Sequence, residues 1–164
     1  MEITGLRLNF IRMSAGDFPF FARLVTNYSV MKYITGRALN SEEAELRFRK
    51  ALHVNSLNPD AGYFVVFRKE DNEFIGVVKL VNFEPSVMEV GYMLLPEYWG
   101  KGFASEMLRY VVEFARLKYP GVELTGIVDP ENPASIRVLE KFGFYLYKTG
   151  RIDDQDAAFY KLNL

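Results

Sequence analysis

The sequence predicts one α+β domain, in which helices flank a mixed, mostly antiparallel sheet with one parallel strand pair. Three observations support this fold class. The chain has 164 residues, which fits a single domain over 1–164 and leaves little room for two. Strand-like runs follow one another directly in the middle of the chain, which indicates antiparallel pairing. A strand-helix-strand unit over 87–128 indicates one parallel pair with a right-handed crossover.

The first third of the chain carries one strand and two helical segments. Residues 6–13 alternate apolar and polar side chains, as a half-buried strand does. A helical segment over 14–26 begins with a serine cap, and an irregular, aromatic-rich stretch over 28–39 follows it. Acidic residues in the first turn then open a helix that we expect over 41–55.

Three strands are predicted in the middle of the chain, over 63–68, 74–81 and 87–95. The first two are joined by a polar hairpin loop at 69–72. The third contains Gly91, and an isolated glycine in a strand suggests a bulge or a close approach of another backbone.

A clear amphipathic helix starts at about Ala104 and is stopped by Pro120-Gly121, before a strand over 122–128. Its charged side chains recur at three- and four-residue steps, on the face opposite to the apolar one. These charged residues are Glu106, Arg109, Glu113 and Arg116.

The last third is predicted to hold one helix and two strands. The helix runs over 133–141, with proline at its first position and Gly143 just past its end. Two strands, 144–148 and 158–162, close the chain and are joined through an acidic loop at 153–156. These late strands could pair between two copies, which leaves room for a homodimer.

Composition excludes several kinds of function. The net charge of -1 gives no positive field for nucleic acid. The chain has no cysteine, and with His53 as its one histidine it cannot assemble the usual zinc sets, so no metal site is expected. No apolar run is long enough for a membrane span, and the first residues do not resemble a signal peptide. The sequence therefore predicts a cytoplasmic protein without nucleic-acid or membrane partners.

A glycine-rich turn lies between the strand ending at Leu95 and the following helix. A helix start leaves backbone N–H groups unpaired and carries a partial positive charge, and Lys101 adds a full charge. This combination suits a phosphate or pyrophosphate. The run Gly100-Lys101-Gly102 lacks the pattern of a Walker A loop and of a dinucleotide fingerprint. Taken alone, it could equally be a tight turn before a surface helix.

Two segments together are more specific. Residues 89–106 (EVGYMLLPEYWGKGFASE) resemble the cofactor motif of the Gcn5-related N-acetyltransferases, and 132–144 (NPASIRVLEKFGF) resemble the second motif of that superfamily. The start of the chain is also similar to the branch that acetylates the N-termini of ribosomal proteins. The resemblance covers essentially the whole chain and is closest from Glu89 to Phe144.

The resemblance implies an acetyl-CoA site on a sheet whose parallel strand pair is splayed. The amide-rich pantetheine arm would bond to the strand residues Met93, Leu94 and Leu95, and it would also contact Asn132. Trp99 is expected to serve packing. The pyrophosphate would lie on the backbone N–H groups of Gly100, Lys101, Gly102, Phe103, Ala104 and Ser105.

The same resemblance implies catalytic residues. Glu89 is the candidate general base, acting directly or through a water, and a strand N–H near Tyr92 or Met93 would stabilise the oxyanion. Many members have Tyr where this chain has Leu139, so Ser135, one turn earlier, is the candidate acid for the leaving thiolate. A plain surface carboxylate at Glu89 and a plain helix-start hydrogen bond at Ser135 stay open. The absence of cysteine favours direct transfer over an acyl-enzyme.

The acceptor would be a primary amine, either a protein N-terminus or a small polyamine-like or amino-sugar molecule. In related enzymes the segment equivalent to 28–37 borders the acceptor, so one or two of Tyr28, Met31 and Tyr33 are expected there, with most other aromatic residues in the core. A second class of function stays open: a catalytically silent acyl-CoA-binding module, favoured only by Leu139.

Overall fold

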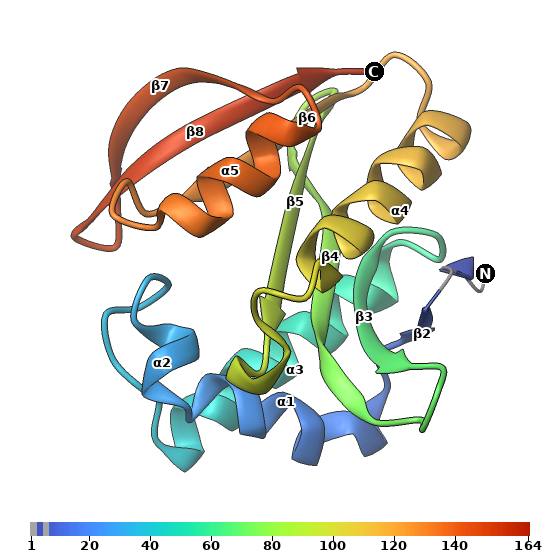
Figure 1. Cartoon of the computed structure of the whole chain (residues 1–164), viewed down its shortest axis with the longest axis vertical. Coiled ribbons are helices and arrows are strands. Elements are labelled where there is room, and N and C mark those ends of the chain that lie inside the picture. Colours follow the sequence, from blue (N-terminus) through green and yellow to red (C-terminus); the bar gives the residue numbers. More distant parts are fainter. Residues whose placement is uncertain (1–2, 5–6) are drawn as a thin grey trace.

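The computed structural model describes residues 3–4 and 7–164 and shows one eight-stranded sheet in the order β1-β2-β3-β4-β5-β6-β8-β7. Neighbouring strands are antiparallel except β5 and β6, which run parallel, so the predicted fold class is confirmed (Figure 1). The strands are β1 (Ile3–Thr4), β2 (Leu8–Arg12), β3 (Gly62–Arg68), β4 (Phe74–Glu84), β5 (Val87–Leu94), β6 (Glu123–Val128), β7 (Tyr145–Ile152) and β8 (Gln155–Asn163). The helices are η1 (Ala15–Asp17), α1 (Phe18–Val25), α2 (Tyr28–Met31), α3 (Ser41–Leu57), η2 (Pro96–Tyr98), α4 (Phe103–Lys118) and α5 (Pro133–Lys141).

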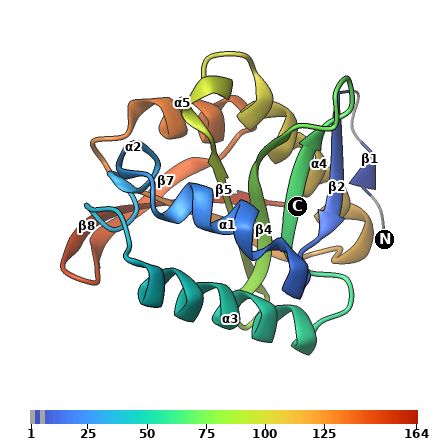
Figure 2. The same cartoon turned by 90° about the horizontal axis from the view of Figure 1, so that it is seen from below.

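Helices cover both faces of the sheet, and each face has its own apolar core. Helices α4 and α5 lie in front of the sheet in Figure 1 and pack on Val90, Leu94 and their neighbours. Helices α1 and α3 cover the other face, where Phe21 of α1 contacts Phe48 of α3 over Val77 (Figure 2). The sheet thus separates two cores.

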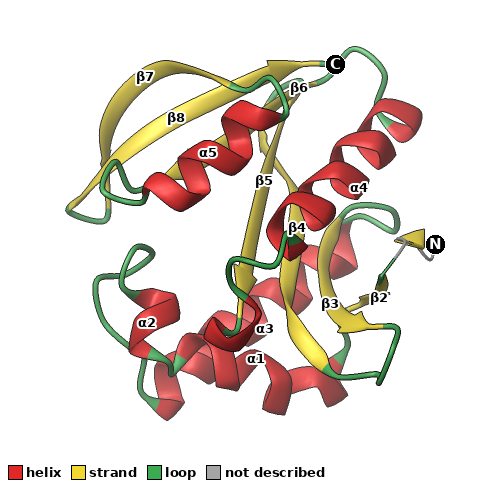
Figure 3. Ribbon diagram, in the orientation of Figure 1, coloured by secondary structure: helices red, strands yellow, loops and turns green. Residues whose placement is uncertain are grey.

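Strand β5 leaves strand β6 halfway along its length. Their parallel pairing ends at Val90 and Gly126, after which β6 stays with β8 and β5 stays with β4. The sheet therefore opens into two parts, β1–β5 and β6–β8. Figure 3 shows these two parts diverging between β5 and β6. This gap confirms the splayed strand pair.

The expected bulge at Gly91 is wrong. Gly91 pairs regularly with Lys79, and the shift of register between β4 and β5 falls between Asn82 and Glu84 instead. The glycine provides room for a neighbouring side chain, because a Cβ there would lie 2.7 Å from Cε of Lys79. The other option that the sequence offered, a close approach of another backbone, is not observed either, since the nearest atoms belong to the side chain of Lys79.

The N-terminal half matches its predicted elements with shifted ends. The strand expected over 6–13 is β2, and Leu6 lies outside the described residues. The helix expected over 14–26 is divided into η1 and α1, and the stretch expected to be irregular contains the short α2, whose N-cap is Asn27. Helix α3 continues to Leu57, because the buried Asn55 stays within it and receives the backbone N–H of Tyr63 at 2.7 Å.

Two expectations for the C-terminal half are wrong in detail. The final strands are longer than predicted, and their turn consists of Asp153 and Asp154, which both have positive φ (48° and 64°), while Gln155 already belongs to β8. Glu106, expected on the charged face of α4, is 8% exposed. It is buried because Arg7, next to β2, folds over it as an ion-pair partner.

Candidate active site

The glycine turn lies between β5 and α4, beside the gap in the sheet. Gly100 and Gly102 both have left-handed φ values (70° and 79°), and a Cβ at Gly100 would meet nothing within 4 Å. Gly102 is the N-cap of α4 and no side chain caps this helix start. The first amides of a helix have no partner inside the helix, so this start presents donors to an anion.

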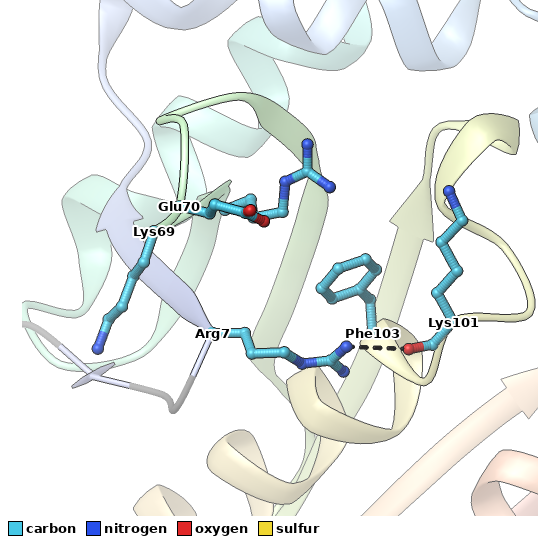
Figure 4. A pocket seen from close by; sticks show the side chains of 6 residues that line it. Arg7, Lys69, Glu70, Lys101 and Phe103 are labelled. Atoms are coloured by element: carbon cyan, nitrogen blue, oxygen red, sulfur yellow. Dashed lines mark hydrogen bonds between the residues drawn. The ribbon is translucent and has the colours of Figure 1, made fainter.

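A cavity of about 390 Å³ lies on the flank of this turn, between the turn and the start of β2 (Figure 4). Four of its lining side chains are cationic and one is a carboxylate. Its lining residues are Arg7, Arg68, Lys69, Glu70, Lys101 and Phe103. Arg68 is engaged by Asp71 in an ion pair at the hairpin. Arg7 is likewise paired, with Glu106, so two of the four cations on this flank are held in ion pairs.

Trp99 contributes to the shape of the turn. Its indole Nε1 donates a hydrogen bond of 2.9 Å to the carbonyl oxygen of Leu94, and its ring is 48% exposed. The N–H of the indole is thereby used within the chain. This contact agrees with the expectation that Trp99 packs and does not bind phosphate.

The backbone groups of Met93, Leu94 and Leu95, which were predicted to contact the pantetheine arm, point to two different edges of β5. Leu95 donates its N–H to Ile75 at 2.9 Å, and the Met93 carbonyl oxygen lies against Gly76, so both groups face β4. Backbone groups alternate along a strand, so those of Tyr92 and Leu94 face the widening gap. The backbone groups that a ligand in the gap could meet are therefore those of Tyr92 and the N–H of Leu94, because the Leu94 carbonyl oxygen accepts the indole N–H of Trp99.

Glu89 lies at the apex of the gap. It is paired with Thr125 of β6 one residue before the pairing ends. Its carboxylate is 18% exposed and contacts Nζ of Lys79 at 2.6 Å. By the alternation of strand side chains, Glu89 shares a face with Met93, on the side of α1 and α3. The candidate base is therefore a half-buried, paired carboxylate that faces away from α4 and α5.

Ser135 and Asn132 lie on the opposite face of the sheet, at the start of α5. Asn132 accepts the backbone N–H of Ser135 with Oδ1 at 3.2 Å, which fixes its amide so that Nδ2 donates to Ser135 Oγ at 3.1 Å. The Ser135 hydroxyl thus accepts one hydrogen bond and keeps its own proton to donate. The helix-start bond is made by the backbone, so it does not consume this hydroxyl.

The side chain of Tyr92 also belongs to this group, although the sequence had indicated at most its backbone N–H. Its hydroxyl donates to the carbonyl oxygen of Ser135 at 3.4 Å, so it links β5 to the start of α5. Burial raises its pKa to about 12, so the hydroxyl stays protonated at neutral pH. The signal in the sequence was its place two residues after Val90, on the core face, where a tyrosine hydroxyl needs a partner.

Of the three residues near α2 that were candidates for the border of the acceptor site, the structure excludes Met31 and leaves Tyr28 and Tyr33. Met31 is fully buried, so it packs in the core and cannot line an acceptor groove. Tyr28 is 58% exposed and Tyr33 is partly exposed, so both remain available at this surface. His53 is exposed, as expected.

Within residues 3–4 and 7–164, no three side chains of the metal-ligating types His, Asp and Glu come together as a site for an ion. No helix there combines the length and the apolar character that crossing a bilayer needs.

Known proteins resemble this chain over most of its length. The family model of the Acetyltransferase (GNAT) domain matches residues 7–145. YkkB of Bacillus subtilis is 30% identical over 148 residues, which cover 86% of this chain and 83% of the relative. Spermidine N(1)-acetyltransferase of Vibrio cholerae is 27% identical over 135 residues, 80% of this chain and 75% of that protein.

A solved structure shows the same fold. RimL, a ribosomal L7/L12 alpha-N-protein acetyltransferase in complex with coenzyme A, has a TM-score of 0.82 at 18% identity and covers 100% of this chain and 98% of its own. The family model spans most of the chain, including the glycine turn and the start of α5. The chain therefore belongs to the GNAT family and is an N-acetyltransferase of that family.

Proposed function

We propose that this protein transfers the acetyl group of acetyl-CoA to the primary amine of an acceptor by direct attack. The observation that carries the proposal is the gap between β5 and β6. It has the carboxylate of Glu89 on one face of the sheet and the Ser135–Tyr92 pair on the other, beside an uncapped helix start. A thioester in the gap would lie within reach of both.

The residues around the gap fit the two polar parts of acetyl-CoA. The amides from Gly100 to Ser105, with Lys101, suit its pyrophosphate, because the helix start offers donors and positive charge. The open edge of β5, formed by the backbone of Tyr92 and the N–H of Leu94, suits an amide-rich arm that bonds like a strand, while the Leu94 carbonyl oxygen already accepts the indole N–H of Trp99. Bound there, acetyl-CoA supplies the activated acetyl group, and the chain supplies orientation and proton transfer.

Glu89 takes the proton of the attacking amine in this proposal, directly or through a water. Its face of the sheet is the one covered by α1 and α3, so the acceptor approaches from that side. Lys79 binds Oε1 of Glu89 and holds the carboxylate in place. The other oxygen, Oε2, is assigned to the amine of the acceptor. The Tyr92 N–H, at the open edge of β5, is assigned to the developing oxyanion.

Ser135 is assigned the proton that the leaving thiolate takes up. Asn132 supports this role because its Nδ2 donates to Ser135 Oγ and leaves the serine O–H free to point elsewhere. Tyr92 holds the Ser135 backbone from the other side and remains neutral. Leu139 takes no part, since it is 2% exposed and fills the space beside Gly126.

The acceptor that fits best is the N-terminal amine of a polypeptide. Lys79 places an ammonium group 2.6 Å from Glu89, so the candidate base does not form a purely acidic site. A polyamine brings several positive charges and would be repelled by Lys79, whereas a polypeptide N-terminus brings one. Both kinds of acceptor occur among similar proteins, since RimL is a ribosomal-protein alpha-N-acetyltransferase and the Vibrio cholerae enzyme is a spermidine N(1)-acetyltransferase.

Thiol release from acetyl-CoA tests the proposal with a panel of N-terminal peptides and spermidine. The chain has no cysteine, so every thiol detected comes from the cofactor. We expect Glu89→Gln to lower kcat by about 100-fold or more while acetyl-CoA affinity is kept. Glu84→Gln, an exposed carboxylate on β4, is the matched control and should leave kcat unchanged. If acetyl-CoA binds but no amine increases thiol release, the protein is a silent acyl-CoA-binding module.

For a homodimer, we propose that two copies meet along the outer edge of strand β7. Strand β7 is the last strand of the sheet, and every residue in it is exposed. Leu146 and Ile152 are among its exposed apolar side chains (51% and 40%). An unpaired edge of this kind offers a full row of backbone donors and acceptors to another strand.

A further inference from the structure

Arg7 contacts the glycine turn from a distant part of the sequence. Its backbone N–H and its Nε donate to the two carboxylate oxygens of Glu106, at 2.8 Å and 2.7 Å. Its guanidinium also donates to the carbonyl oxygen of Lys101 at 3.1 Å and lies 4.3 Å from the centre of the Phe103 ring (Figure 4). Arg7 thus contacts three residues of the turn and helix start, Lys101, Phe103 and Glu106.

We infer that Arg7 is a positioning residue, which holds the turn between β5 and α4 in the shape that binds the cofactor's pyrophosphate. The inference rests on the proposed function, since it assigns the pyrophosphate to this turn. Arg7 itself lies on the far side of the Lys101 carbonyl and acts through the backbone.

The geometry of the peptide bond explains how this works. In a planar trans peptide, the carbonyl oxygen of one residue and the N–H of the next point in opposite directions. Arg7 fixes the carbonyl oxygen of Lys101, so it also directs the N–H of Gly102 away from the cavity and toward the other side of the turn. Gly100 and Gly102 flank this peptide, and glycine backbones rotate with little resistance. Without Arg7, the peptide between Lys101 and Gly102 would lose the hydrogen bond that fixes the direction of its N–H.

Charge gives Arg7 a second effect on the same turn. Glu106 lies in the first turn of α4 and is 8% exposed. An unpaired carboxylate there would oppose the positive end of the helix and repel an anion. Arg7 neutralises it at 2.7 Å. The pair thus leaves the helix start positive, although an acidic residue is buried within it.

Arg68 lies on the same cavity and provides a matched comparison. It carries the same charge, but its bonds go to Asp71 within the hairpin between β3 and β4. A general positive field would depend on Arg68 as much as on Arg7. Of these two arginines, Arg7 is the one that bonds to the backbone of the turn, whereas Arg68 only lies 5.4 Å from the ring of Tyr98 before it.

The experiment titrates the full-length chain with acetyl-CoA and with S-acetylpantetheine, which lacks the pyrophosphate. We expect Arg7→Met to weaken acetyl-CoA binding by about 10-fold, the worth of one hydrogen bond to a charged donor, and to leave S-acetylpantetheine binding unchanged. Arg7→Lys should recover part of the loss, because an ammonium keeps the charge beside Glu106 but cannot make both bonds. Arg68→Met should change either affinity by less than about threefold.

A double variant protects the test against misfolding. Arg7→Met leaves Glu106 buried without its partner, so Arg7→Met/Glu106→Gln removes both charges. Acetyl-CoA should still bind about 10-fold more weakly, because the donor to Lys101 is still missing. Wild-type affinity in the double variant would overturn the inference, as would an equal loss for both ligands or an equal loss in Arg68→Met. If the wild-type chain itself does not bind acetyl-CoA, the proposed function fails.

Discussion

Helices α4 and α5 both begin beside the gap in the sheet, yet their first turns are built in opposite ways. Helix α4 starts at Gly102 without any side-chain cap. Helix α5 starts with Asn132, whose Oδ1 accepts the Ser135 N–H, and with Pro133, which has no N–H to satisfy. The first start therefore keeps its donors for a ligand, while the second satisfies its own and offers a hydroxyl instead.

The largest expected effect comes from closing the open start of α4. Gly102→Glu should weaken acetyl-CoA binding by more than about 100-fold, because it puts a carboxylate among the donors and strains a left-handed residue. Calorimetric titration measures this loss.

Gly121→Glu is the matched control. Gly121 has almost the same φ (81° against 79°), and a Cβ there meets nothing within 4 Å. It lies at the other end of α4, so its variant should carry the strain of about 1–2 kcal/mol and still bind acetyl-CoA normally. Equal binding losses in both variants would mean that backbone strain, and not the anion site, explains the effect.

The next effect concerns Tyr92, which faces the start of α5. Burial raises its pKa to about 12 from an ordinary value of 10. As pH rises from 10 to 12, the unfolded chain loses this proton while the folded chain keeps it, so the free energy of unfolding falls by up to about 3 kcal/mol. Tyr92→Phe should lack this loss. Urea unfolding at a series of pH values measures it, and Tyr28→Phe, at an exposed tyrosine, should behave as the wild type.

Ser135→Ala separates the hydroxyl of α5 from its cap. The cap uses the backbone N–H of Ser135, so helix stability should be kept. We expect kcat to fall by about 10-fold, with acetyl-CoA affinity unchanged, if the hydroxyl supplies the proton and water replaces it poorly. An unchanged kcat in steady-state assays would assign the proton to Tyr92 or to water.

The smallest effect distinguishes the two bonds of Asn132. Asn132→Ala should lower the free energy of unfolding by about 1 kcal/mol, as the loss of a helix cap does. Asn132→Asp should keep the cap but accept the Ser135 proton instead of donating to Ser135 Oγ. Its stability should therefore resemble the wild type while its kcat resembles that of Ser135→Ala. Chemical denaturation and thiol-release kinetics, read together, check both parts.

Local signals made most of the fold predictable. Helix α5 begins and ends where proline and glycine predicted, and the glycine turn was found because its residues are consecutive. The sequence also indicated the parallel pair, because a helix between two strands leaves few other arrangements. Glu89 and Ser135 were reached through the family resemblance, and the structure shows them on opposite faces of one gap.

Contacts between distant residues could not be predicted. Glu106 fits the charged face of α4 by spacing, and only its partner Arg7, 99 residues earlier, explains why it is buried. The bulge was expected at Gly91 because the sequence does not show that Lys79 lies across it. Met31 was one of three candidates for the border of the acceptor site, taken from the family resemblance, whereas a short helix turns it into the core.

The contact between Arg7 and Glu106 also bears on how the molecule folds. Helix α4 and the turn before it are local in sequence, but joining residues 99 positions apart requires the chain to close a long loop. During synthesis Arg7 leaves the ribosome long before Glu106 is made, so this ion pair can form only later. With Arg7 in its proposed role, we expect acetyl-CoA affinity to appear only once Arg7 and Glu106 have met, and so later in refolding than the helical signal of α4.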